Sequence, residues 1–533
     1  MKLDYKKTFY IGLAFFLITM FWQTYDSVIS KILIDKFGMN QTWSGFVMAF
    51  DNVLALFLIP LFGTLSDKQE SKKGRRTPYI IVGTIIASFA FMGLSFSDSM
   101  QASKLRAETS ITSDYELVQD DEITQIEWTT MQSAIENEWT LLLGDGIITQ
   151  ERYDEVEAEI IVAMDQYLVD NDISQNEEDQ LKELYYSHLN QRAWVQTSQS
   201  PAIFIVFVIN LLVALLAMAT FRSPAVALMP DVTIKPLRSK GNAVINLLGT
   251  FGGILAIIVL TVFGLDNLSY VNYTPAFITI GVLMLVLLGI FLWKVNERKL
   301  VSEREELDIK LGLTEEAEAK ELHESVAILN KNKRKSLFLI LASVFLWFTG
   351  YNAVTTKLSD YAPKVLDMGF SLPLLIAQGA ALISFIPIGI LATKIGRRKT
   401  ILGGIIMLTL CFGSVYFLTP DTAFVMYIVF ALTGVAWATI NVNSYPMVVE
   451  LAKGSDVGKY TGYYYTFSMA AQILTPILSG ILMDNTALGR KILFPYAALF
   501  VFASLITMLF VKHGDAKIIP KGSILESFDV DMD

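Results

Sequence analysis

The sequence predicts an all-α membrane protein. We expect twelve transmembrane helices in two pseudo-symmetric six-helix halves, with an acidic helical insert outside the membrane between helices 3 and 4. Three observations predict it. The 533 residues are 53% hydrophobic and only 18% charged, which leaves too little polar surface for a soluble protein. Twelve stretches are apolar enough to cross a bilayer, and one charged motif recurs at half-chain spacing.

Each apolar stretch holds the roughly 20 residues that a helix needs to cross the hydrocarbon core. The stretches lie at 8–34, 43–64, 78–96, 201–224, 242–263, 273–294, 336–357, 371–393, 399–418, 421–446, 459–482 and 488–511. Lys2, Lys6 and Lys7 precede the first stretch, as basic residues precede the apolar part of a signal peptide. We expect an uncleaved helix, because this stretch is too long for a signal peptide and no small-residue cleavage site follows it.

The distribution of positive charge predicts the orientation. With the N-terminus in the cytoplasm, the cytoplasmic segments hold 31 of the 42 lysines and arginines and the outer segments hold 11. Five of those 11 lie in the long insert, where the positive-inside rule has little force. We therefore expect both termini to be cytoplasmic in a multi-pass protein of the cell membrane.

A charged segment at the end of the second apolar stretch has a counterpart at the end of the eighth. The first reads GTLSDKQESKKGRRTPYI at 63–80 and the second reads GILATKIGRRKT at 389–400. A repeat at this spacing indicates two related halves. The expected domains are the N-terminal half at 1–96 and 201–294, the insert at 97–200, the linker at 295–335, the C-terminal half at 336–512 and the tail at 513–533.

The pattern G-x-x-x-D-[RK]-x-G-R-[RK] in these segments resembles the signature loop of the major facilitator superfamily. The longer spacing from Asp67 to Gly74, followed by RRTP, is similar to that of the glycoside-pentoside-hexuronide cation symporters and of sucrose-type transporters. SPAVALMPDVTIKPLRSKGNAVINLLG at 223–249 resembles the link between helices 4 and 5 of the same group. The resemblance covers the twelve helices but not the insert, and it implies the major facilitator fold and secondary active transport.

The resemblance also implies a gating role for the signature loop. In the superfamily the matching Asp and Arg belong to a latch that holds the cytoplasmic side shut, which implies that role for Asp67 with Arg75 or Arg76. The N-terminal end of helix 11 should lie on the same side, where its dipole favours a carboxylate. The alternative is a solvated loop whose cations contact anionic lipid. In the second copy Thr393 replaces the acid, so a weaker latch is expected there. The predicted gating residues are Asp67, Arg75, Arg76, Arg397 and Arg398.

Two carboxylates lie inside predicted helices, where charge is costly and usually functional. In helix 1, polar residues three or four apart form one stripe that should face a cavity: Thr19, Trp22, Gln23, Asp26 and Ser30. Asp26 and Asp51 lie at similar distances from the outer ends of their helices, hence at similar depth. A carboxyl group in a low-dielectric cavity beside a second acid retains a proton more readily than in water. We predict proton coupling through Asp26 and Asp51; the alternative is that each only hydrogen-bonds to a neighbouring helix.

The predicted coupling ion is H+, with Na+ as the alternative. Melibiose-type relatives place two carboxylates four residues apart in helix 2, the second just before a proline. Ala55 and Ile59 occupy the matching positions before Pro60. This departure disfavours sodium coupling of that design.

Neutral polar residues recur along several other predicted helices. Amides can hold vicinal hydroxyls through paired hydrogen bonds, and indole rings can cover the apolar faces of a sugar. The predicted substrate-binding residues are Trp22, Gln23, Asn246, Asn352, Trp437, Asn441 and Gln472. The same residue types also hold membrane helices together, so helix packing is the alternative for each.

No Lys or Arg lies near the middle of a predicted helix, and Arg222, toward the cytoplasmic end of helix 4, comes closest. An anionic substrate would normally need a buried cation, so phosphates and dicarboxylates are disfavoured. Arg222 either reaches inward or extends to the lipid headgroups.

Two segments lie outside the predicted helices. Residues 97–200 hold 23 Asp and Glu against 5 Lys and Arg. We expect a solvated helical cap on the outer face, with a docking or gating domain as the alternative. The linker at 295–335 should be amphipathic helix that braces the cytoplasmic face.

The sequence thus predicts a proton-coupled symporter of a glycoside or small oligosaccharide that works by alternating access. An amphiphile transporter, for a lysolipid or lipophilic drug, is the alternative within transport, and a non-transporting sensor that uses the insert is another. Nucleotide-binding and hydrolase motifs are missing, so neither ATP-driven transport nor an enzyme is expected. We expect no cofactor, no metal and no nucleic-acid partner. The expected partners are a small-molecule substrate, which the polar lining indicates to be a sugar, and the bilayer around a monomer.

Overall fold

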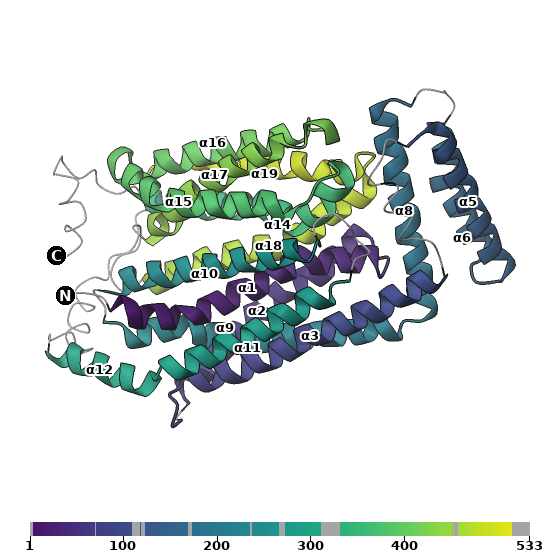
Figure 1. Ribbon diagram of the computed structural model, residues 1–533. Coiled ribbons are helices and arrows are strands. Elements are labelled where there is room, and N and C mark those ends of the chain that lie inside the picture. Colours follow the sequence, from purple (N-terminus) through teal and green to yellow (C-terminus); the bar gives the residue numbers. More distant parts are fainter. Residues whose placement is uncertain are drawn as a thin grey trace.

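The computed structural model describes residues 4–69, 71–108, 118, 123–168, 173–234, 237–265, 272–310, 331–449, 451 and 457–513. Every regular element within these residues is a helix, and the long helices form one bundle (Figure 1). Eleven of the described helices are long and apolar enough to cross a membrane, and a twelfth contributes the shorter apolar stretch Ser371–Phe385. The predicted all-α membrane fold is confirmed.

The first six membrane helices form one half of the bundle. They are α1 (Tyr5–Asp35), α2 (Gln41–Asp67), α3 (Thr77–Glu108), α9 (Ala202–Val232), α10 (Arg238–Val262) and α11 (Thr274–Lys294). The second half consists of α14 (Lys331–Val365), α15 (Ser371–Ile395), α16 (Arg397–Val415), α17 (Val425–Val449), α18 (Val457–Asn485) and α19 (Leu493–Leu509). The helix α12 (Glu297–Lys310) follows the first half, and two short 3-10 helices, η3 (Pro420–Thr422) and η5 (Gly489–Ile492), precede α17 and α19.

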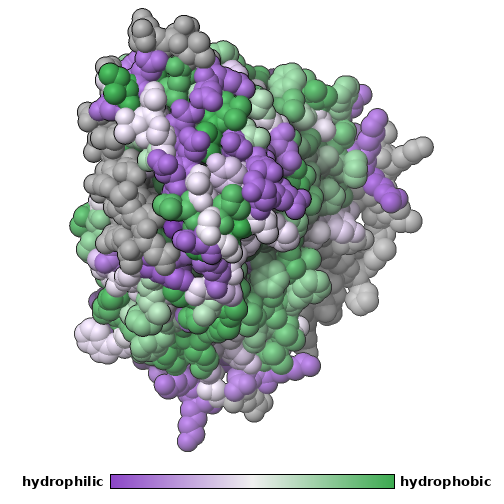
Figure 2. Space-filling view, turned by 90° about the vertical axis from the view of Figure 1, so that its right-hand side faces the viewer, coloured by the Kyte–Doolittle hydropathy of each residue, from purple (hydrophilic) through white to green (hydrophobic). Residues whose placement is uncertain are grey.

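The insert forms a separate layer across one end of the bundle (Figure 1). It contains α5 (Gln125–Gly144), α6 (Gln150–Val156), a π-helical turn at Glu157–Ile161, α7 (Val162–Asp165) and α8 (Gln175–Gln199). We call this end of the bundle the insert end, and the opposite end, where α1 begins and α19 ends, the termini end. Hydrophilic side chains spread over the upper part of the face seen from the insert end, and hydrophobic ones gather lower down (Figure 2).

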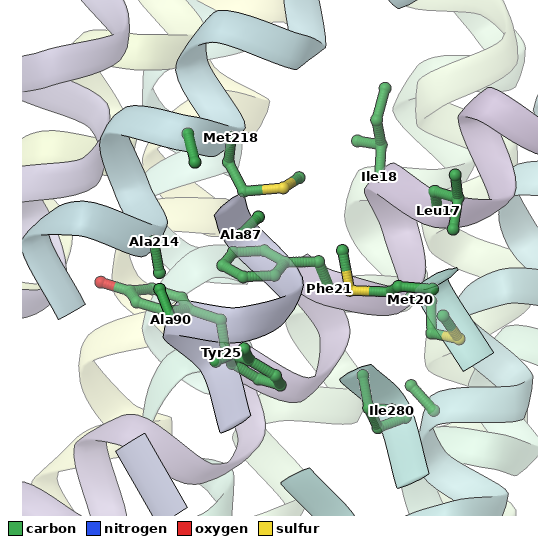
Figure 3. Close-up of a cluster of buried hydrophobic side chains, with 14 of the residues drawn as sticks. Leu17, Ile18, Met20, Phe21, Tyr25, Ala87, Ala90, Ala214, Met218 and Ile280 are labelled. Atoms are coloured by element: carbon green, nitrogen blue, oxygen red, sulfur yellow. The ribbon is translucent and has the colours of Figure 1, made fainter. Parts of the chain in front are cut away.

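Each half and the insert has its own hydrophobic core. In the first half, the rings of Phe21 and Tyr25 on α1 lie among small residues of α3 and α9, including Ala87 and Ala214 (Figure 3). The small side chains let the helices approach closely enough to enclose the aromatic rings. In the insert, Trp128 and Trp139 are fully buried. The insert is therefore a folded unit with its own packed core.

The glycine of the charged repeat has a positive φ in both halves. Gly74 has φ +106° just before α3, and Gly396 has φ +94° just before α16. A side chain is strained in this region of φ, so glycine suits both positions. The two segments therefore share a glycine of positive φ before a membrane helix, which begins directly after Gly396 and three residues after Gly74.

The two halves meet along three helix pairs: α1 with α14, α2 with α18, and α10 with α15. Toward the insert end, α2 and α18 approach backbone to backbone. A Cβ atom on Gly45 would lie 2.2 Å from the carbonyl oxygen of Pro476, and one on Gly480 would lie 2.4 Å from that of Gln41. Only glycine permits this approach, which closes the seam between the halves there.

Candidate functional site

A cavity of about 270 Å³ lies between the two halves. Its lining from the first half is Ile18, Thr19, Trp22, Asp26, Met48, Asp51, Asn52 and Arg222. Its lining from the second half is Asn352, Thr355, Thr356, Gln472 and Pro476. Because α1, α2 and α9 face α14 and α18 across this space, a molecule held here would contact both halves at once.

Both predicted carboxylates line this cavity. Asp26 lies one turn after Trp22 on α1, and the shared stripe brings Thr19, Trp22 and Asp26 to the same wall. Asp51 is buried on α2, and its Oδ1 accepts a hydrogen bond of 2.7 Å from the side-chain amide of Asn52. The sequence prediction that the two acids share one site at similar depth therefore corresponds to the geometry.

Arg222 also lines the cavity, so the expectation that no cation lies near the middle of a helix is wrong. The fourth predicted span ends at 224, whereas α9 continues to Val232, so Arg222 lies well inside the helix. The guanidinium carbon of Arg222 lies 5.7 Å from the centre of the Trp22 ring, a cation–π geometry. Of the two alternatives for Arg222, the structure shows the inward one.

The cavity holds two acids and one base without a close ion pair between them. Among the described side chains, no nitrogen of Arg222 lies within 4.0 Å of a carboxylate oxygen of Asp26 or Asp51. With all three ionised the site carries one net negative charge, and one bound proton makes it neutral. The charge of the guanidinium thus offsets that of one carboxylate across the cavity, and the charge of the other carboxylate is left over.

Two buried donors in the cavity wall have no acceptor among the described residues. They are the indole Nε1 of Trp22 and the amide Nδ2 of Asn352, from opposite halves. A buried donor without a partner is costly, and an acceptor supplied by a bound molecule would remove that cost. The walls are thus suited to a ligand with acceptors on two sides.

Four of the predicted substrate-binding residues lie outside the cavity lining. Gln23 is occupied by another side chain, because its Oε1 accepts a hydrogen bond of 2.6 Å from Gln378 of α15. Trp437 stacks on Tyr351, with ring centres 3.7 Å apart and planes 8° from parallel. Asn246 and Asn441 have exposed side chains. Of the predicted set, Trp22, Asn352 and Gln472 lie in the cavity wall.

Sequence reasoning missed Ile18, Met48, Thr356 and Pro476 as lining residues. Thr356 follows Asn352 by four residues and donates a hydrogen bond of 2.7 Å to its carbonyl oxygen, so both lie on one face of α14. This spacing was a signal that could have found Thr356. Ile18, Met48 and Pro476 carried no such signal, because apolar residues are common throughout membrane helices.

The signature loop forms a charge cluster within the first half. Arg76 pairs with Asp67 of α2, and its Nε lies 2.7 Å from Asp231 of α9. Arg75 also pairs with Asp231, at 2.9 Å. Burial lowers the pKa of Arg76, but its hydrogen bond to Asp231 and the two nearby carboxylates raise the pKa above its usual value, so Arg76 stays charged.

Glu297 of α12 completes this cluster. Its buried carboxylate accepts hydrogen bonds from the backbone N–H groups of Arg75, Arg76 and Thr77, at 2.7–3.1 Å, and from the hydroxyl of Thr77 at 2.7 Å. Thr77 begins α3 and Arg75 and Arg76 immediately precede it, and the first N–H groups of a helix have no partner within that helix. The start of the linker therefore caps a membrane helix of the first half.

In the second copy of the motif, Arg398 donates a hydrogen bond of 2.7 Å to the carbonyl oxygen of Leu509, and Arg397 begins α16. The side chain of Thr393 and most side chains at the start of α18 lie outside the described residues. The predicted gating contact with α18 therefore stays a prediction. Among the described residues, no group of three or more His, Cys, Asp or Glu could hold a metal ion.

Family models match most of the chain. The model described as Major Facilitator Superfamily matches residues 193–419 and 370–519, and the model described as MFS/sugar transport protein matches residues 10–112. One curated relative, the sucrose transport protein SUC3 of Arabidopsis thaliana, is 36% identical over 64 residues. That segment covers 12% of this chain and 11% of the relative, so the match is confined to about a tenth of either protein.

Solved structures resemble the whole chain at low identity. A D-xylose-proton symporter aligns with a TM-score of 0.56 at 14% identity and covers 96% of this chain and 98% of its own. The xylose transporter XylE from E. coli, in an inward open conformation, aligns with a TM-score of 0.53 at 16% identity. The alignment covers 99% of this chain and 98% of the transporter. A bacterial homologue of the iron transporter ferroportin aligns with a TM-score of 0.59 at 12% identity. The alignment covers 95% of this chain and 99% of the homologue. At such identities the likeness concerns the fold.

Proposed function

The chain belongs to the Major Facilitator Superfamily, and we propose that it is a proton-coupled symporter of a glycoside or small oligosaccharide. Secondary transport and a multi-pass membrane location follow from the family and the apolar helices. The proposal of a proton-coupled sugar symporter rests on the cavity between the halves, where Asp26, Asp51 and Arg222 lie beside donors that have no acceptor among the described residues.

Proton coupling is supported by the charge balance of the cavity. Two carboxylates and one guanidinium leave one negative charge, which is costly in a membrane-embedded site unless a proton or a cation neutralises it. In the described lining, the two carboxylates are the groups that can take up and release a proton. A proton is therefore the coupling ion that these residues favour, with Asp26 and Asp51 as its carriers.

A sugar-like substrate is supported by the hydrogen-bonding groups of the wall. Trp22 and Asn352 supply free donors from opposite halves, and Asp26, Asp51, Asn52 and Gln472 add acceptors and further amides. Hydroxyl groups both donate and accept, so a polyol can satisfy both kinds of group at once. The match to a sugar-transport family model over residues 10–112 adds to this, since α1 and α2 supply most of these groups.

We further propose that the insert end faces outward from the cell membrane and that both termini are cytoplasmic, following the excess of Lys and Arg at the termini end. The working unit is a single chain, because both walls of the cavity come from one chain. The cavity does chemistry no more demanding than proton exchange, and we propose no enzymatic activity for it.

The proposed function is tested by flux in proteoliposomes. A panel of glycosides, simple sugars and lysolipids is added outside, with and without sodium, and internal pH is recorded. A sugar-dependent proton influx that does not need sodium supports the proposal. A response to lysolipids with none to sugars would replace it by amphiphile transport, and a sugar response that requires sodium would replace the coupling ion.

The substitution Asp26→Asn tests the coupling residue. We expect it to abolish uphill transport while substrate binding and exchange persist, because the amide keeps hydrogen bonds but takes up no proton. The matched control is Asp421→Asn, which changes an exposed acid of η3. Uphill transport by Asp26→Asn at the level of the control would contradict the coupling role.

A further inference from the structure

The helix α8 of the insert is anchored to the first half by its C-terminal part. The side-chain amide of Asn190 donates to the carbonyl oxygen of Ile34 in the last turn of α1, at 3.1 Å, and to that of Met39 in the segment between α1 and α2, at 2.8 Å. Gly38 lies so close to α8 that a Cβ atom would meet the backbone nitrogen of Trp194 at 2.1 Å. Only one residue separates the last helical turn of α8 from Pro201, the N-cap of α9. This part of α8 is therefore attached to the first half by side-chain, backbone and chain connections.

The N-terminal part of α8 binds the second half through three ion pairs. Asp179 pairs with Lys491 at 2.7 Å, Lys182 pairs with Asp367 at 2.8 Å, and Glu183 pairs with Arg490. Positions 179, 182 and 183 are spaced three and four apart and lie on one face of the helix. Their partners lie in η5 and in the turn between α14 and α15. One helix thus spans both halves at the insert end.

These ion pairs continue into a buried network between the halves. The Nε of Arg490 lies 2.8 Å from Asp360 of α14, which also accepts from Gln41 of α2 at 2.6 Å. Lys364 lies 2.7 Å from Asp360 and also pairs with Asp35 of α1. Asp360 is fully buried. Charges held in this way are costly to leave unpaired, so the network favours the arrangement in which the insert end is closed.

One face of α8 is packed into the core of the insert. Tyr185, Tyr186 and Leu189 of α8 are buried in the core of the insert with Trp128 and Trp139. Trp139 also donates a hydrogen bond of 2.9 Å to Nδ1 of His188. The expectation of a solvated cap is therefore wrong for α8, whose one face is packed into the insert while another is paired with the second half.

We propose that α8 is a latch that holds the insert end closed, and that its three ion pairs to the second half break each time the halves separate there. The latch lowers the population of the conformer open at the insert end. It goes beyond the proposed transport function, because it acts on the equilibrium between conformers whatever the substrate is.

The test measures the distance across the insert end by pulsed electron paramagnetic resonance. Spin labels are attached at Ser103→Cys on α3 and Asp421→Cys on η3, both exposed, after Cys411→Ser removes the buried native thiol. The charge reversals Asp179→Lys and Lys491→Asp are made singly and together. We expect each single reversal to raise the population of the longer distance about fivefold or more, and the double reversal to restore the short distance.

Two further variants keep the test decisive. Lys182→Gln removes a second pair of the latch without reversing charge, so it should shift the distances in the same direction if a reversal variant fails to fold. Arg152→Glu breaks the pair with Glu155 inside the insert, at 2.8 Å, and a hydrogen bond of 3.2 Å to Gln191 in the C-terminal part of α8. It leaves the three ion pairs to the second half in place, so the distances should not change. Distances unaltered in every folded latch variant, or altered equally by Arg152→Glu, overturn the latch. No substrate is needed, so the outcome is separate from that of the flux assay.

Discussion

The insert end and the termini end both hold buried charge, but they use it differently. At the insert end, Asp360 connects Arg490 and Lys364 of the second half to Gln41 of the first half. At the termini end, Glu297 and Asp231 hold the signature loop within the first half and its following helix. The first network crosses a boundary that the proposed alternating access would open, and the second lies within a half that this proposal treats as one unit. The same chemistry can therefore either oppose a motion or make a moving part rigid, depending on which elements it joins.

Removing the central acid of the insert-end network should have the largest effect. In Asp360→Asn, Arg490 and Lys364 lose a buried carboxylate shared between them. We expect the free energy of unfolding to fall by about 3–5 kcal/mol, measured by thermal unfolding in detergent. Asp421→Asn on the surface is the control. An unchanged midpoint would mean that the network contributes little to stability.

Neutralising Glu297 should weaken the termini end without opening the insert end. Glu297→Gln replaces a carboxylate that accepts hydrogen bonds from three backbone N–H groups with a neutral amide. We expect the free energy of unfolding to fall by about 1.5–3 kcal/mol. The distance between labels at Ser103 and Asp421 should stay as in the parent protein. Glu303→Gln in the same helix is the control. A longer distance would show that the two networks are coupled, and would contradict their separate roles at the two ends.

Adding a methyl group at the two motif glycines compares the two copies directly. Gly74→Ala faces a positive φ and would also place Cβ 2.3 Å from the carboxyl carbon of Glu297. In Gly396→Ala the alanine must also adopt a positive φ, and this backbone strain costs about 1–3 kcal/mol. We expect both to lower the unfolding midpoint and Gly74→Ala to lower it more. The reverse order would mean that Glu297 yields easily and does not brace the loop.

The smallest effect is expected at an exposed pair of the termini end. The Nζ of Lys7 on α1 lies 2.6 Å from Glu303 of α12, and both side chains are largely exposed. Solvent and salt screen such pairs, so Lys7→Ala should cost about 0–1 kcal/mol. The same unfolding assay at low and high salt checks this. If Lys7→Ala lowered the free energy of unfolding as much as Asp360→Asn, burial would not explain why the two ion pairs differ.

The cavity shows how far sequence reasoning reached into the site. The stripe through Trp22 and Asp26 was visible because helical spacing fixes which side chains share a face. The depth of Asp51 followed from counting residues along α2. The side-chain partners of Gln23 and Trp437 did not follow, since each depends on a residue of another helix, Gln378 or Tyr351. Polar and aromatic residues in membrane helices serve packing as readily as binding, and spacing alone does not separate the two.

The sequence by itself determined the twelve apolar helices, the two-half organisation and the placement of two acids at one depth, because hydropathy, helical period and motif repetition are local properties of the chain. The tertiary structure decided that Arg222 faces the cavity, that Arg75 and Arg76 pair within one half, and that α8 reaches both halves. These features depend on which charged groups meet across long separations in sequence. Burial makes each such charge select a specific partner, and only the packed fold shows which one it meets.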